Sequence, residues 1–109
     1  MKIIRYLDSS GRAHYGAEAA DGSVQRIEGD IFAKHRVTAE RAAVAKLLAP
    51  VVPTQILCIG LNYRRHAEET KAKLPVQPIL FIKSINTLQH PGDPIVFPTQ
   101  LASNDVVYA

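Results

Sequence analysis

The sequence predicts an α+β fold, in which a small N-terminal module of a β-meander and one helix precedes a module of short strands and a polar helix. Three observations support this. Short apolar runs separated by turn residues occur in both halves of the chain. A run of helix formers that ends at a proline follows the first set of strands. The 109 residues, 47% hydrophobic and 21% charged, have the composition of a globular domain.

The first module, residues 1–50, begins with three short runs of β-forming residues. We expect strands over Lys2–Leu7, Ala13–Ala19 and Ser23–Ile27, which together form an antiparallel meander. Asp21 and Gly22 separate the last two runs and are typical of a type I′ hairpin turn, in which both central residues have positive φ.

A helix is expected over Thr38–Ala49. Thr38 is a suitable N-cap because its hydroxyl can accept a hydrogen bond from a free amide of the first turn. Helical spacing places apolar side chains on one face, and Pro50 ends the helix. The apolar residues are Val44, Leu47 and Leu48.

The second module, residues 51–109, contains two compact apolar runs that are typical of buried strands, Gln55–Gly60 and Ile79–Lys83. Between them, Tyr63–Lys73 is expected to form a helix with almost no apolar face, as in a surface element or a mobile lid. A turn is expected at Pro91–Pro94. Further short strands are expected at Ile95–Phe97 and Asp105–Tyr108.

Composition and charge exclude several classes of protein. The single cysteine, Cys58, cannot form an internal disulfide, which is typical of a reducing cytoplasm. The net charge of +3 is too small to indicate a nucleic-acid partner. No apolar run is long enough to span a membrane, and Asp8 and Arg12 interrupt any apolar signal peptide. We therefore expect a soluble cytoplasmic protein without nucleic-acid or membrane partners.

His66 and Glu69 are the strongest candidates for chemistry, because they stand three positions apart on the expected helix and both project from one face. A carboxylate beside an imidazole orients the ring and suits general acid–base catalysis. The same spacing also suits half of a metal site, or a solvated helix face with no function. Lys83 ends an apolar strand, where its ammonium group either reaches water or binds a carboxylate or enolate oxygen.

Three ordered segments, ILCIGLNYRRHAEE, PVQPILFIK and HPGDPIVFP, resemble the fumarylacetoacetate hydrolase family. The family pattern is G-x-N-Y-x-x-H-x-x-E, then P-x-L-F-x-K, then P-G-D-P-I. The resemblance covers residues 54–109. Residues 1–50 resemble, more loosely, the small N-terminal domain of many prokaryotic members.

The resemblance implies an enzyme that hydrolyses, decarboxylates or isomerises small 2-oxo or β-diketo acids through an enolate stabilised by Mg²⁺ or Mn²⁺. It implies that His66 and Glu69 form an acid–base or water-activating dyad on a lid helix. It also implies that Lys83, Asn62 and Tyr63 contact the substrate. Because homodimers are common in the family, we expect a homodimer.

Two departures from the family pattern stand out. The family's metal ligands, a Glu-x-Glu pair and a later aspartate, are expected just after Ala109, so we expect none in this chain. Arg65 stands before His66, where many members have an acidic residue. The sequence thus leaves open an enzyme fragment, a truncated non-catalytic paralogue that serves as an interaction or dimerisation module, and a nucleic-acid binder supported only by mild basicity.

Overall fold

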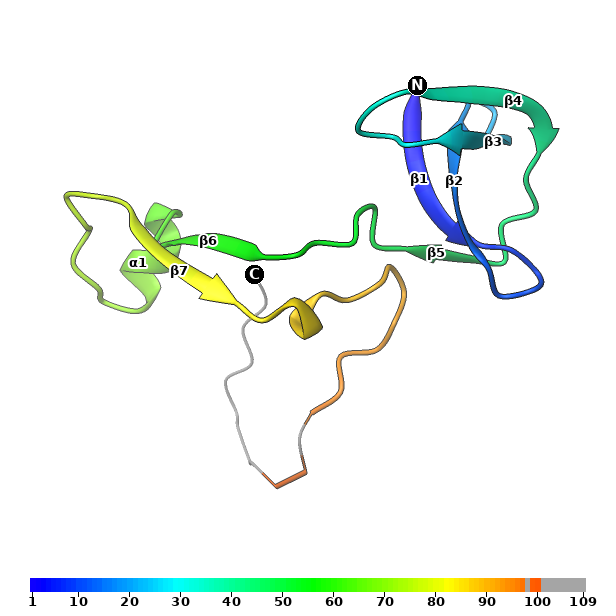
Figure 1. Cartoon of the computed structure of the whole chain (residues 1–109). Coiled ribbons are helices and arrows are strands. Elements are labelled where there is room, and N and C mark those ends of the chain that lie inside the picture. The colour runs from blue at the N-terminus through cyan, green and yellow to red at the C-terminus, as the bar shows by residue number, and fades with distance from the viewer. Residues whose placement is uncertain (98, 101–109) are drawn as a thin grey trace.

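The computed structural model describes residues 1–97 and 99–100 and consists mostly of antiparallel sheet with little helix (Figure 1). One sheet has five strands in the order β4-β3-β2-β1-β5, and the other pairs β6 with β7. The strands are β1 (Lys2–Leu7), β2 (Ala13–Glu18), β3 (Val24–Gly29), β4 (His35–Arg41), β5 (Lys46–Leu48), β6 (Ile56–Gly60) and β7 (Ile79–Lys83). The helices are α1 (Arg64–Glu69) and a 3₁₀ turn, η1 (Ile85–Thr87).

The core of the five-stranded sheet is a small apolar cluster. Ile4, Tyr6 and Val24 are buried together, and Ala42 packs against them. Three further buried residues lie on the other side of the sheet. The register places Ala17 opposite Ile3, Ile27 opposite Tyr15 and Leu48 opposite Arg5. The strand predictions for Lys2–Leu7, Ala13–Ala19 and Ser23–Ile27 are confirmed to within two residues at each end.

The predicted hairpin between β2 and β3 is present, but its turn is not of type I′. The amide of Gly22 donates to the carbonyl of Ala19 (3.0 Å), and Gly22 has φ +79°. Asp21 does not have a positive φ, and its side chain accepts hydrogen bonds from both the amide (2.9 Å) and the hydroxyl (2.7 Å) of Ser23. The turn therefore needs a left-handed conformation at the glycine alone.

The predicted helix over Thr38–Ala49 is wrong, because this segment forms β4 and β5. β4 pairs with β3, and β5 pairs with β1 at the opposite edge of the sheet. The Thr38 hydroxyl, expected to cap a helix, instead donates to the carbonyl of Arg26 (3.0 Å). Helix propensity is a weak preference, and pairing along two sheet edges satisfies this backbone instead.

In the second module, both predicted buried strands are confirmed as β6 and β7. The predicted helix Tyr63–Lys73 is shorter, because α1 ends at Glu69. Ile95–Phe97 does not form a strand. The strand predicted at Asp105–Tyr108 lies outside the described residues. The helices within the described part of the chain are all too short or too polar to span a bilayer.

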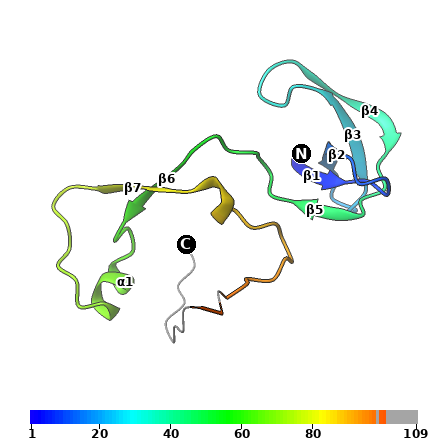
Figure 2. The same ribbon diagram turned by 60° about the horizontal axis from the view of Figure 1, so that its bottom comes forward.

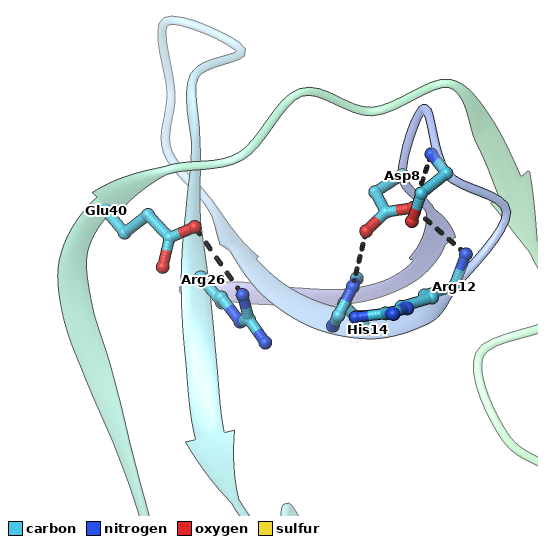
Figure 3. Close-up of polar contacts among 6 residues, drawn as sticks. Asp8, Arg12, His14, Arg26 and Glu40 are labelled. Carbon is cyan, nitrogen blue, oxygen red and sulfur yellow. Dashed lines mark hydrogen bonds and ion pairs between the residues drawn. The ribbon is translucent and has the colours of Figure 1, made fainter.

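Asp8 organises the loop between β1 and β2 (Figure 3). Its carboxylate accepts hydrogen bonds from the hydroxyl (2.7 Å) and amide (2.8 Å) of Ser10, from the amide of Arg12 (3.0 Å) and from Nε2 of His14 (2.8 Å). The His14 ring in turn lies against Tyr6, with 5.7 Å between ring centroids. These donors, the Ser10 hydroxyl first, hold the pKa of Asp8 well below its usual range.

We predict that Asp8→Asn makes the stability of the first module less dependent on acid. In the unfolded chain Asp8 takes up a proton near pH 4, whereas in the folded chain it stays ionised to lower pH. Its contribution is therefore complete above about pH 4 and is lost as the pH falls below that value. Thermal unfolding measured from pH 6 to pH 2 should show a shallower acid limb for Asp8→Asn. A limb as steep as that of the wild type would contradict the role of Asp8.

Gly16→Ala tests the packing inside the first sheet. An added methyl group on the buried Gly16 would collide with the side chain of Val24 and come within 3.1 Å of the Tyr6 ring. We expect a loss of about 1–3 kcal/mol in the free energy of unfolding, measured by urea denaturation. Gly60→Ala is the matched control, because its methyl group would meet Ile79 at an ordinary 3.5 Å. Equal losses in the two variants would rule out this packing.

Candidate functional site

The turn from β6 into α1 contains a residue with a strained backbone conformation. Leu61 has φ +52°, in the left-handed region that a bulky L-residue rarely adopts. Glycine adopts positive φ most readily, yet here the positive φ falls on Leu61 and not on the preceding Gly60. Tyr63, and not Asn62, is the N-cap of α1, and its side chain makes no capping hydrogen bond. Strained residues of this kind cluster at functional sites, where the surrounding fold maintains them.

His66 and Glu69 lie on α1 as the sequence predicted, with His66 Nδ1 3.9 Å from Glu69 Oε2. This distance allows an ion pair but exceeds a hydrogen bond, so the carboxylate orients the ring only loosely. The side chains are 45% and 76% exposed, respectively. Between them, Ala67 is 1% exposed and anchors the helix. The pair therefore faces solvent from a helix that one small residue holds in place.

The end of α1 explains why the helix is shorter than predicted. Lys71 has φ +53°, its amide donates to the carbonyl of Glu68 (3.1 Å), and the Ala72 amide donates to the carbonyl of Ala67 (2.9 Å). This pair of bonds is a Schellman motif, which usually places glycine where Lys71 stands. Because lysine and alanine are good helix formers, the prediction from composition extended the helix through Lys73.

Lys83 lies apart from α1. The register pairs Gly60 with Ile79 and Ile56 with Lys83, so Lys83 is at the end of the two-stranded sheet opposite the turn into α1. Four residue steps along a strand span about 13 Å. Figures 1 and 2 both place α1 at the Gly60 end of the hairpin. The structure therefore does not bring Lys83 together with His66.

Asn62 and Tyr63, in contrast, belong to the same short segment as the histidine. Both residues are exposed, Tyr63 by 74%, and they fill the positions between Leu61 and the first residue of α1. The structure thus gathers four of the five predicted site residues into one strained turn and one helix.

The described residues do not fit a metal ion. Nowhere in residues 1–97 and 99–100 do three histidine, cysteine, aspartate or glutamate side chains meet in an arrangement that could hold one. His66 and Glu69 alone would supply at most two donors, whereas Mg²⁺ and Mn²⁺ prefer several oxygen ligands.

Besides the helix end at Lys71, sequence reasoning missed the left-handed Leu61 and the contact of His90 with Ala49, the residue after β5. No local signal marks Leu61, because leucine is not a turn residue. The Ala49 amide donates to His90 Nδ1 (3.0 Å) across 41 positions of sequence, and so large a separation leaves no pattern in a single sequence.

Comparisons with known proteins divide the chain into two matched ranges. Residues 55–108 match the model of the family described as "Fumarylacetoacetate (FAA) hydrolase C-terminal", and residues 1–50 match that described as "Rv2993c-like, N-terminal". No solved structure gave a significant match.

Curated relatives carry the same family name or named enzymatic activities. A fumarylacetoacetate hydrolase domain-containing protein 2 homolog from Dictyostelium discoideum is 44% identical over 63 residues, covering 58% of this chain and 20% of the relative. A 2,4-didehydro-3-deoxy-L-rhamnonate hydrolase from Sphingomonas is 29% identical over 120 residues, covering 96% and 41%. The human mitochondrial oxaloacetate tautomerase FAHD2A is 39% identical over 54 residues, covering 49% and 17%. The chain thus spans less than half the length of each of these relatives.

Replacing Lys71 by glycine tests the end of α1. Glycine adopts positive φ without the steric cost that lysine bears, so Lys71→Gly should stabilise the end of α1 by about 1 kcal/mol. Amide exchange at Ala72 should slow about fivefold. Lys73→Gly is the control and should not slow it, because Lys73 lies beyond the motif. Faster exchange in Lys71→Gly would contradict this account of the helix end.

Proposed function

Because the chain belongs to the fumarylacetoacetate hydrolase family, we propose that it forms part of an enzyme that acts on small 2-oxo or β-diketo acids. The reaction is a C–C bond hydrolysis, a decarboxylation or an isomerisation. The names of two relatives, a hydrolase and an oxaloacetate tautomerase, support hydrolysis and isomerisation. The observation that carries the proposal is the exposed His66–Glu69 pair on a helix that follows a strained turn.

His66 acts as the acid–base group and Glu69 orients it. Nδ1 of His66 faces the Glu69 carboxylate at 3.9 Å, which leaves Nε2 to exchange a proton with the substrate or with a water molecule. Tautomerisation of a 2-oxo acid moves a proton between a carbon and an oxygen, so a group that both takes and returns a proton suits it. The long apo distance is compatible with this role, because catalytic hydrogen bonds often shorten only when substrate binds.

Asn62, Tyr63 and Lys83 bind the substrate in this proposal. Asn62 and Tyr63 are exposed beside the start of α1, where they can reach a ligand of His66. Lys83 would bind a carboxylate or enolate oxygen, but it lies about 13 Å along the strands from the end of the hairpin that leads into α1. A small acid can touch both His66 and Lys83 only if α1 closes over the sheet. Its weak anchoring through Ala67 makes α1 suited to act as such a lid.

The family resemblance implies Mg²⁺ or Mn²⁺, but the described residues do not fit such an ion. Any metal would therefore have to be held by groups other than the described residues, and we assign it no step. We further propose that the protein is a homodimer and that it lies in the cytoplasm.

A second candidate function is a non-catalytic interaction module. One face of the β6–β7 pair is apolar and open, with Leu57, Ile59, Leu80 and Ile82 each at least 46% exposed. Exposed apolar faces of this kind mark interaction sites in folded proteins. On this alternative, the hairpin pairs with another surface and His66 is a solvated helix residue.

The catalytic proposal can be tested in a chimera. In the chimera, this chain would replace the matching part of the Sphingomonas hydrolase. The alignment between the two covers 96% of this chain. We expect His66→Asn to lower kcat at least 100-fold and Glu69→Gln to lower it less, because a positioned acid–base group contributes about 10²–10⁴-fold.

Glu68→Gln is the matched control, because Glu68 is an exposed neighbour on the same helix, and it should stay within about twofold of the parent chimera. The isolated chain should show no turnover of oxaloacetate or an acylpyruvate and no tight Mg²⁺ binding by calorimetry. Full activity of His66→Asn in the chimera would favour the interaction module instead.

A further inference from the structure

The described chain joins its two sheets through a second contact besides the connecting peptide. β5 is an edge strand, since the sheet order ends β1-β5. An edge strand leaves one row of backbone amides and carbonyls without a partner strand. Ala49, which directly follows β5, is nevertheless 2% exposed, and its amide donates to Nδ1 of His90 at 3.0 Å.

A tight turn presents His90 to this edge. The Asp93 amide donates to the His90 carbonyl (3.1 Å), Pro91 and Gly92 are the central residues, and Gly92 has φ +80°. Proline followed by a left-handed glycine is the sequence of a type II turn. The Gln89 side chain donates to the carbonyl of Pro94 (2.6 Å) and closes the turn from outside. The first and last residues of the turn are therefore held close together.

The last residue of the turn makes the other half of the contact. Asp93 Oδ1 lies 2.6 Å from Nζ of Lys46, the first residue of β5. The two side chains are 27% and 43% exposed, so this ion pair lies at the rim of the contact and the His90 bond lies further inside. The two ends of the turn thus contact the segment Lys46–Ala49 at its first and last residues.

We propose that the edge Lys46–Ala49 is a docking surface for the His90–Asp93 turn, and that this clasp fixes the N-terminal sheet relative to the β6–α1–β7 segment. Lys46 and Ala49 lie in the matched range 1–50, and His90 and Asp93 lie in 55–108, so the clasp joins two separately recognised modules. The segment that carries His66 is then attached at two points, through the peptide after Ala49 and through the clasp. The clasp therefore restricts rotation of this segment about the peptide that follows Ala49.

The bond also requires one form of the imidazole. Nδ1 can accept from the Ala49 amide only when it carries no proton, so the neutral ring has its proton on Nε2. This selection gives the clasp a spectroscopic signature that does not depend on any activity.

The test uses the whole ¹⁵N-labelled chain in solution. We expect ring ¹⁵N shifts of the Nε2-protonated tautomer for His90, and an Ala49 amide that exchanges about tenfold faster in His90→Ala. Lys46→Asp and Asp93→Lys should each speed that exchange, and the double variant should restore it. Gln89→Ala is the matched control, because Gln89 bonds within its own segment, and it should leave Ala49 less affected than His90→Ala does.

Amides of β2 and β3 report whether each variant folds. If these amides lose their protection in His90→Ala, that variant does not fold, and the Lys46 and Asp93 variants then test the proposal. Their side chains are partly exposed, and the double variant has the same net charge as the wild type. An Ala49 amide that exchanges freely in the wild type, or that no variant changes, would overturn the proposal. A double variant that fails to restore protection would overturn it too.

Discussion

The antiparallel register of β6 and β7 determines where each candidate site residue lies. Five consecutive pairs, from Gly60 with Ile79 to Ile56 with Lys83, place the turn into α1 at one end of the hairpin and the lysine at the other. A shift of one residue would turn every side chain to the opposite face. The separation of His66 from Lys83 therefore follows from backbone pairing, and only movement of α1 relative to the sheet can shorten it.

A two-stranded sheet is marginal by itself, and this one has apolar side chains on both faces. The less exposed face carries Cys58 and Phe81, and the other carries Leu57 and Leu80, which are 56% and 62% exposed. In the described chain, the hairpin is attached by its connecting peptides and by the clasp at His90. Each proposed function requires a further surface on the hairpin, which an enzyme would supply from its own domain and an interaction module from a partner.

Sequence patterns predicted the elements whose stability is local. β1, β2, β3, β6 and β7 are short apolar runs bounded by turn residues, and each lies where its pattern placed it. The helix prediction for Thr38–Ala49 was wrong because the propensities of its residues suit a helix. In the fold, β4 forms its backbone hydrogen bonds with β3, and β5 forms its own with β1. Such pairing spans many residues and leaves no periodic mark. For the same reason, no pattern pointed to the partnership of Ala49 with His90.

In the candidate site, too, the sequence predicted the arrangement that depends on neighbouring residues and not the arrangement that depends on distant ones. The i, i+3 spacing of His66 and Glu69 specified their shared helix face, and the structure keeps them within 3.9 Å. Whether they meet a substrate depends on strain at Leu61, on the one buried residue of α1 and on the distance to Lys83. A helix held by Ala67 alone costs little to move, while a clasped N-terminal module gives it a fixed base. The proposed closure of α1 over a small acid would require such a helix to move while its base stays fixed.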